Sequence, residues 1–426
     1  MIDELKNEVE KTLGRKISSR GDCELLAEDL YAKTGLIISY NTFRRLFRII
    51  EFRKPRESTL DAMSIYIGFQ SYQDFTKRFS EVDTWPMWEH LYVMLSVSNS
   101  DEILSYLHYL KRQQNNFSIA FTIVVRELLN RNDISTLLLI FRDPLLNFHA
   151  LPYDQVAQIG VLIGLHFRNF HHKELEEVLL LEDNFRDLVF KIFVDYGRLN
   201  GSYGSWIDFL AGLSTLDKET ISFLTCLCIW RNLLNLQNSD QKHESNTLKL
   251  ERGIHPILFG RIFGIKLLTS NNQKQNRKCI ALLEDRISEE PNFVTELLYE
   301  PAVQALVFKS KVHQEILAKY ESKINQIQFW YHLSQAAIHR VYQSKVLIEQ
   351  GQWIKAKNKL DSIPFGHMRH GYREFVELYV TFFKLKIAKA LAEPFEVLES
   401  DFHNRKNKLT YTLFSDDYFE NYFNNN

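Results

Sequence analysis

The sequence has 426 residues, of which 45% are hydrophobic and 25% charged, and its formal net charge is −1. These values are ordinary for a folded soluble protein, and the length is typical of about two to three domains. Only 16 glycines and 9 prolines occur. This scarcity argues against a turn-rich β architecture and predicts an all-α fold in which helices are joined by short loops.

The N-terminal segment, MIDELKNEVEKTLG, alternates acidic residues and lysines around Ile2, Leu5, Val9 and Leu13. This spacing predicts an amphipathic helix rather than a signal peptide. A transmembrane helix needs roughly 18 apolar residues in a row, and the richest apolar run covers only residues 221–230. We therefore expect a cytoplasmic protein that does not enter a membrane.

A second helix is predicted over residues 23–34, within CELLAEDLYAKTG. Gly35 lies just past its end, where glycine adopts a left-handed cap with little strain. The residues that we expect to be buried are Leu25, Leu26, Leu30 and Tyr31.

The next helix is predicted to begin after Ser39, a residue type that often caps a helix N-terminus. Its apolar residues fall at i, i+3, i+4 and i+7 and form one stripe for a core: Phe43, Leu46, Phe47 and Ile50. The opposite face carries Asn41, Arg44, Arg45 and Arg48. From residue 40 to residue 56, six basic residues stand against one acidic residue, so the positive charge of a nearly neutral chain is concentrated here.

A short helix with several arginines on one face can meet DNA phosphates while its first turn reaches base edges. Arginine and asparagine also match guanine and adenine in the major groove. The alternative is a solvated face, or arginines that pair with acidic residues elsewhere. On the first interpretation, the DNA-contacting residues are Asn41, Arg44, Arg45, Arg48, Arg53, Lys54 and Arg56.

Two further helices are predicted downstream. Ser58 is a candidate N-cap for the first of them, which runs to Gly68, and Ser71 with Asp74 approximates a capping box for the second. Short helices with tight connections predict a compact bundle of the helix-turn-helix kind.

Residues 20–80 resemble the Cro/repressor type of helix-turn-helix domain. The resemblance lies in a LAEDL helix, a turn, an S-x-x-T helix with arginines, a loop with Lys54 and Pro55, and an S-T-L helix ending near Gly68. It implies that the second of the paired helices enters the major groove of duplex DNA, with Tyr40 and Thr42 as DNA contacts in addition to Asn41, Arg44, Arg45 and Arg48. Two-fold operators need two reading heads, so we also expect a homodimer.

Beyond residue 80, apolar helical patterns of roughly 9 to 19 residues recur, and several are apolar on more than one face, as in stacked helical hairpins. Residues 330–364 resemble a tetratricopeptide hairpin, with Gly351 and Trp353 at the turn and Ala356 and Leu360 facing inward. We therefore predict a DNA-binding bundle over residues 1–80 and an irregular α-solenoid over residues 81–426. The polar stretch 237–247 is expected to be an exposed loop that could subdivide the solenoid.

No motif for enzymatic chemistry is present: the sequence has no phosphate-binding glycine loop, no G-x-S-x-G, no H-E-x-x-H and no EF-hand loop. The cysteines and the cluster His166, His171 and His172 lack ligand spacing for a metal. We expect no catalytic activity, no metal and no cofactor. The aromatic and acidic tail, residues 411–426, either packs on the last hairpin or docks a partner.

Two functions remain open. The first is a sequence-specific DNA-binding transcriptional regulator, whose helical array senses a peptide, protein or small ligand or mediates dimerisation. This architecture resembles that of helix-turn-helix plus tetratricopeptide regulators. The second is a protein–protein interaction scaffold that does not bind DNA, which the near-neutral total charge favours.

Overall fold

The computed structural model describes residues 2–97, 99–113, 116–168, 170, 172–237, 241–270, 272–324, 332–363, 365 and 371–424. Across these ranges the regular elements are helices and no strand occurs, which confirms the all-α prediction. None of the helices in these ranges is long and apolar enough to cross a membrane.

The chain divides into two compact units, residues 1–103 and residues 104–426. Residue 80, where the sequence placed the domain boundary, lies within helix α5 (Tyr72–Val97). Each unit is described by itself below.

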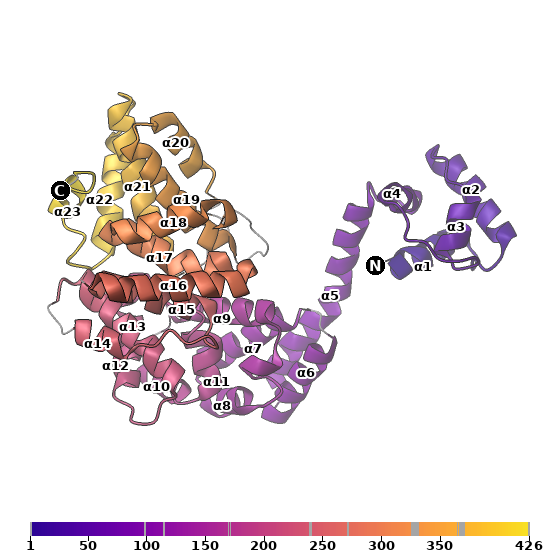
Figure 1. Ribbon diagram of the computed structural model, residues 1–426. Helices are drawn as coiled ribbons and strands as arrows, with labels where there is room; N and C mark the ends of the chain where they lie inside the picture. The colour runs from indigo at the N-terminus through magenta and orange to yellow at the C-terminus, as the bar shows by residue number, and fades with distance from the viewer. Residues whose placement is uncertain are drawn as a thin grey trace. The chain divides into compact units, whose positions relative to one another are not determined.

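Helix α1 packs against α4 in the first unit, α2 packs against both α3 and α4, and α4 packs against α5 (Figure 1). The bounds of the first four helices are Ile2–Leu13 (α1), Arg20–Thr34 (α2), Tyr40–Leu46 (α3) and Glu57–Tyr66 (α4). Their shared core is built from fully buried side chains that include Leu5, Leu26, Phe43, Met63 and Phe75. The apolar periodicity therefore identified the buried face of most of these helices.

Two sequence predictions for α2 and α4 are wrong. Leu25 and Tyr31 are 40% and 56% exposed, because α2 buries the stripe that runs through Cys23, Leu26 and Leu30. Ser58 is not the N-cap of α4: the helix begins at Glu57, and no side chain hydrogen-bonds its first turn from the cap position.

The second unit is a succession of helices in which sequence neighbours pack on each other, as α7 does on α8 and α17 on α18. Helix α6 contains the division between the units. The bounds are Ser100–Gln113 (α6), Phe117–Asn130 (α7), Ile134–Arg142 (α8), Phe148–Ala150 (η1), Tyr153–Phe167 (α9), Lys173–Leu180 (α10), Asp183–Phe185 (α11), Arg186–Phe190 (η2), Tyr196–Arg198 (η3), Ser202–Ala211 (α12), Lys218–Leu234 (α13), Gln241–Thr247 (α14), Pro256–Thr269 (α15), Gln273–Glu289 (α16), Pro291–Phe293 (η4), Val294–Phe308 (α17), Lys311–Ile324 (α18), His332–Glu349 (α19), Trp353–Asp361 (α20), Arg373–Ala390 (α21), Glu396–Lys408 (α22) and Asp416–Glu420 (α23).

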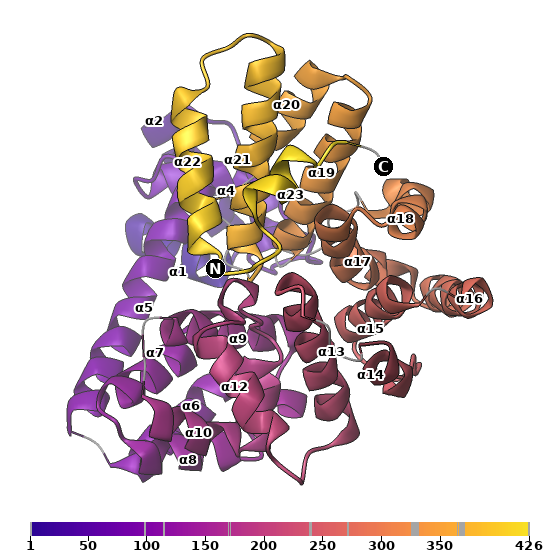
Figure 2. The same cartoon turned by 90° about the vertical axis from the view of Figure 1, so that its left-hand side faces the viewer.

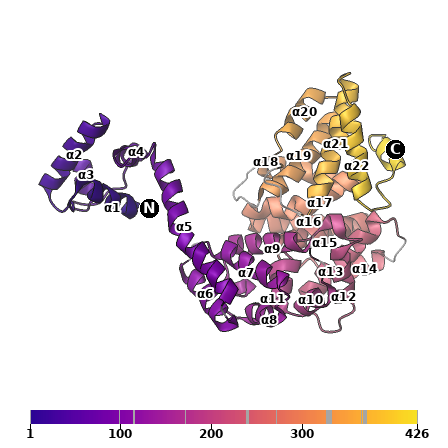
Figure 3. The same ribbon diagram turned by 180° about the vertical axis from the view of Figure 1, so that it is seen from behind.

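The hairpin of α19 and α20 follows the predicted pattern, and Figure 3 shows the two helices side by side. Ala356 and Leu360 are fully buried, and Gly351 forms the turn with a φ of +70°. The predicted Trp330 at the start of this segment lies outside the described residues. The expectation of a loop over residues 237–247 is wrong in part, because residues 241–247 form α14.

The C-terminal tail packs on the last hairpin, as one of the two sequence alternatives proposed, and Figure 2 shows α23 against α21 and α22. The ring centroids of Phe419 and Phe382 are 4.9 Å apart, and the Tyr418 and Tyr379 hydroxyl oxygens are 2.6 Å apart. Tyr422 is fully buried and donates a hydrogen bond of 2.6 Å to the Leu306 carbonyl on α17.

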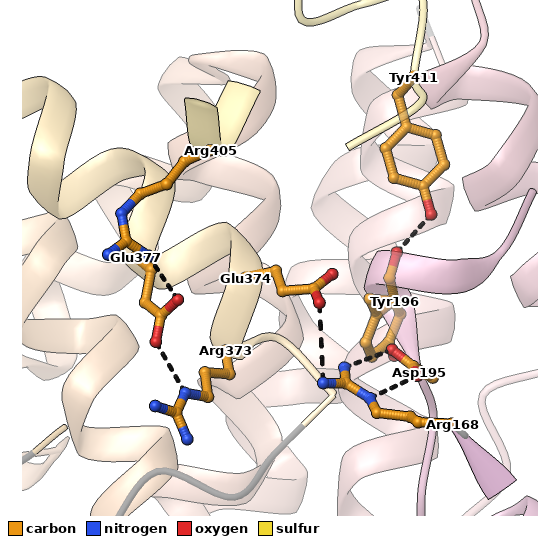
Figure 4. A network of polar contacts seen from close by, with 8 residues as sticks. All are labelled: Arg168, Asp195, Tyr196, Arg373, Glu374, Glu377, Arg405 and Tyr411. Atoms are coloured by element: carbon orange, nitrogen blue, oxygen red, sulfur yellow. Dashed lines mark hydrogen bonds and ion pairs between the residues drawn. The ribbon is translucent and has the colours of Figure 1, made fainter. Parts of the chain in front are cut away.

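A polar network ties the C-terminal helices to the segment between η2 and η3 (Figure 4). The Arg168 guanidinium donates to both carboxylate oxygens of Asp195, at 2.7 and 2.6 Å, and lies 3.7 Å from Glu374 on α21. The Tyr411 hydroxyl donates to the Tyr196 carbonyl and accepts from the Leu199 amide at 3.0 Å. The contacts of Arg168 with Glu374, and of Tyr411 with Tyr196 and Leu199, join residues more than 200 positions apart.

Candidate nucleic-acid interface

The candidate interface is built around α3, whose start agrees with the sequence prediction. The Ser39 side chain accepts a hydrogen bond of 3.3 Å from the Asn41 amide, and Gly35 ends α2 with a φ of +72°. Phe43 and Leu46 are buried against α2 and hold α3 on the bundle. The first turn, with Tyr40, is half-buried.

Helix α3 is shorter than predicted, because it ends at Leu46 rather than near Ile50. The Ile49 amide donates to the Arg44 carbonyl at 2.9 Å, and the Arg48 amide donates to the Arg45 carbonyl at 3.2 Å. This pair of bonds is a Schellman motif, whose C′ residue adopts a left-handed conformation and is usually glycine. Here Arg48 takes that position with a φ of +59°. Arg48 therefore projects from a turn and not from the helix face.

The nine predicted DNA-contacting residues fall into two groups. Those on α3 are half-buried: Tyr40, Asn41, Thr42, Arg44 and Arg45. Those beyond its C-terminus are exposed: Arg48, Arg53, Lys54 and Arg56. The exposed positive charge therefore lies on the turn and loop that follow α3.

Arg44 is the most constrained of these cations. Its Nη1 donates to the Asn41 side-chain oxygen at 3.0 Å, while its buried Nε has no hydrogen-bond partner in the described part of the chain. It also lies close enough to Cys23 to lower the pKa of that thiol, although burial dominates and raises the pKa to about 11. Arg44 therefore has a packing role in addition to its charge.

Five other cations of the unit are paired with carboxylates in the described part of the chain. The pairs are Lys6–Asp3, Lys11–Glu8, Arg15–Asp22, Arg20–Glu24 and Lys33–Asp29. Within the described residues, no such pair involves the basic segment, by which we mean Arg44, Arg45, Arg48, Arg53, Lys54 and Arg56. The alternative of internal neutralisation therefore has no support among the described ion pairs, and the segment keeps an unbalanced positive charge.

Two neighbours of the segment were not identified from the sequence. The Arg20 guanidinium lies 5.2 Å from the centre of the Tyr40 ring, and the Arg48 guanidinium lies 5.6 Å from that of Phe52. The pKa of Asp3 is lowered chiefly by its hydrogen bond to Lys6, and Arg48 contributes a smaller effect. Arg20 follows the Ser19 cap of α2, but nothing in its spacing indicated proximity to α3.

The histidines, cysteines and acidic residues were also searched for a metal site. No group of three or more histidine, cysteine or acidic side chains that could hold a metal ion occurs in the described ranges. The four cysteines are free thiols. His171 of the histidine cluster lies outside the described residues. Comparison with protein families, with curated proteins and with solved structures finds no match to this chain.

Proposed function

We propose that this protein is a sequence-specific DNA-binding transcriptional regulator, in which the basic segment contacts the duplex. The observation that carries the proposal is a set of six cations that have no carboxylate partner among the described residues, in a unit whose described ion pairs neutralise five other basic side chains. Unpaired arginines and lysines are the groups that exchange counterions for DNA phosphates.

The positions of the residues support two kinds of DNA contact, one to base edges and one to phosphates. Asn41 and Arg45 on α3 are suited to base edges, because both residue types pair with purines in the major groove. The exposed Arg48, Arg53 and Lys54 follow the helix and are suited to phosphates, which fix the orientation of a protein on the duplex. The Cro/repressor-like interpretation of α2 and α3 belongs to this proposal.

The second unit would then sense a ligand or partner, or join two chains into a homodimer. A dimer would present two copies of α3 to two half-sites about one helical turn apart. Analytical ultracentrifugation of the full chain tests this part. A monomer at all concentrations used for DNA binding would contradict it.

The proposal is tested by fluorescence anisotropy with labelled duplexes, first of random sequence and then from a pool enriched by selection on the full chain. We expect binding that weakens steeply with salt, and loss of binding in an Arg44→Ala/Arg45→Ala/Arg48→Ala variant with unchanged helical content. A Lys11→Ala/Lys33→Ala variant is the control, because it also removes cations but takes them from paired positions. Absence of salt-sensitive binding by the unmodified chain would refute the proposal.

A protein-interaction scaffold is the second candidate. The observation that favours it is apolar exposure next to the basic segment: Ile37 is 84% exposed, and Leu36 and Phe52 are 38% and 46% exposed. Such side chains fit a protein surface that also carries acidic residues. This candidate predicts a co-purifying protein that is lost in an Ile37→Ser/Phe52→Ser variant, together with no retention of the intact chain on DNA.

A further inference from the structure

The second unit contains a cavity of about 710 Å³, lined by residues from η1, α9, the stretch from η2 to η3, α13, α15, α17 and α19. This volume lies within the range of about 300–1,000 Å³ found for small-molecule sites. All of its walls belong to residues 104–426. The cavity is therefore a property of the helical array alone.

Most of the wall is apolar. Val161 and Leu162 on α9, Ile192 after η2, and Ile257 on α15 are half-exposed and line the cavity, with Phe223 of α13 buried behind them. Half-exposed aliphatic side chains that converge on one concave space favour an occupant with an apolar body.

The charged residues that line the cavity are already engaged with other protein groups. Four of them are carboxylates, and two are cations. Lys191 lies 2.7 Å from Asp187 and 3.9 Å from Glu219, and Asp217 accepts a hydrogen bond from the Thr220 amide as the cap of α13.

Arg261 and Glu300, both at most 4% exposed, form an ion pair at 2.8 Å. The excess of carboxylates disfavours an anionic occupant. The carboxylates already have protein partners: Lys191 for Asp187 and Glu219, the Thr220 amide for Asp217, and Arg261 for Glu300. We therefore assign the main role in binding to the apolar wall.

Two buried polar atoms of lining residues have no hydrogen-bond partner in the described ranges. They are Nη1 of Arg261, whose Nε and Nη2 both donate to Glu300, and Oε1 of Gln335, a residue that is 2% exposed. Buried polar groups are almost always hydrogen-bonded. One is a donor and the other an acceptor, so a hydroxyl or amide group is chemically suited to bond either of them.

We propose that this cavity binds an uncharged, largely apolar organic molecule that carries a hydroxyl or amide group, held against Arg261 and Gln335. This inference names the class of ligand that the second unit would sense, and the regulatory role of that ligand rests on the proposed function. Ligand binding itself is independent of DNA and is measured without it.

Three fluorescent dyes of different charge test the ligand class on the full chain: Nile red, which is uncharged, anilinonaphthalene sulfonate, which is anionic, and thioflavin T, which is cationic. We expect Nile red to saturate at one dye per chain and to bind at least tenfold more tightly than either charged dye. Val161→Trp, which fills the cavity, should weaken Nile red binding at least tenfold. Ile221→Trp is the control, because Ile221 on α13 is 50% exposed and does not line the cavity.

Gln335→Met is a second variant that keeps the shape of the side chain and removes the unpartnered acceptor. Nile red has no hydrogen-bond donor, so this variant is tested with 2-naphthol, an uncharged ring system with a hydroxyl group, which competes with Nile red for the cavity. Gln335→Met should weaken the displacement of Nile red by 2-naphthol several-fold without lowering the melting temperature, since it removes a buried polar group that has no partner. Gln343→Met on the same helix is its control. Gln343 bonds Glu321 and Lys359, at 2.9 Å each, so this change should lower the melting temperature and leave dye binding unchanged.

Unsaturable Nile red fluorescence, equal binding to the Val161→Trp and unmodified chains, or tighter binding of a charged dye would overturn the inference. Duplex binding is measured on the same samples to separate the two proposals. A chain that binds duplex without a saturable dye site contradicts only the inference. A chain with a saturable dye site that never binds duplex contradicts only the proposed function.

Discussion

Arg48→Gly removes one charge from the basic segment with the least disturbance to the fold. Arg48 has a left-handed φ of +59°, which costs an L-residue about 1–2 kcal/mol and costs glycine little. Two destabilising effects offset this relief. The greater backbone freedom of glycine in the unfolded chain costs about 0.5–1 kcal/mol, and the lost contact with the Phe52 ring costs a similar amount. The free energy of unfolding should therefore change by less than about 0.5 kcal/mol.

DNA binding should respond much more strongly than stability. Each lost phosphate contact lowers the slope of log K against log salt by about 0.9. We expect the slope for Arg48→Gly to be smaller than that of the unmodified chain by this amount, in anisotropy titrations of a random-sequence duplex over a range of salt concentrations. Calorimetry of the full chain checks the stability.

Lys11→Ala is the control for the loss of a charge, because Lys11 pairs with Glu8 at 2.5 Å. Its salt slope should match that of the unmodified chain. If Arg48→Gly and Lys11→Ala change the slope equally, or if Arg48→Gly leaves it unchanged, Arg48 does not contact phosphate and our interpretation of the turn is wrong.

Three further predictions concern the second unit. Glu300→Gln strands the buried cation of Arg261 and should cost about 3–5 kcal/mol, visible as a lower melting temperature. An Arg261→Met/Glu300→Met pair should recover only part of the loss, because the buried Tyr196 and Tyr372 hydroxyls, which donate to Glu300, then have no acceptor. Burial lowers the pKa of His339 to about 4, below its usual 6.5, so the unfolded chain binds more protons between these values and stability should fall as pH drops from 7 to 5. Urea denaturation should show about 2 kcal/mol less of this loss in His339→Phe. Gly260→Ala should cost about 1–3 kcal/mol in the same assay, because its Cβ would lie 2.2 Å from the Leu297 carbonyl oxygen, whereas Gly253→Ala should cost little because it has open space.

The helical fold could be predicted because burial follows the apolar periodicity at most positions. Leu5 and Val9 of α1, and Ala356 and Leu360 of α20, are buried as their spacing indicates. The periodicity did not decide which of two neighbouring apolar residues is buried, as exposed Leu25 and buried Leu26 show. One turn of a helix can place either of two adjacent leucines on the core, and only packing against other helices decides.

The end of α3 could not be predicted because its usual signal is missing. A Schellman motif normally carries glycine at the left-handed position, and here that position is Arg48. The apolar stripe through Phe47 and Ile50 also continues past the true end of the helix. The pattern therefore indicated a longer helix and assigned Arg48 to its polar face.

The cavity in the second unit could not be found from the sequence, because its walls come from residues between 148 and 335. One signal was present. Arg261 and Glu300 each lie within a mainly apolar stretch, in ILFGRIFGI and LLYEPAV, and a charge in such a stretch must be paired when it is buried. The sequence could suggest that each needs a partner, but not that they pair with each other.

The salt dependence of binding distinguishes the two functional candidates, because a DNA duplex and an acidic protein neutralise the basic segment in different ways. DNA carries condensed counterions along its whole length, so each phosphate contact adds a fixed increment to the salt slope. A protein partner presents discrete carboxylates without a condensed layer, and exposed ion pairs of that kind contribute at most about 1 kcal/mol each. Six unpaired cations on a duplex would give a slope of up to about 5. A protein partner that binds mainly through Ile37 and Phe52 would give a shallow salt dependence, because apolar burial is not screened by salt.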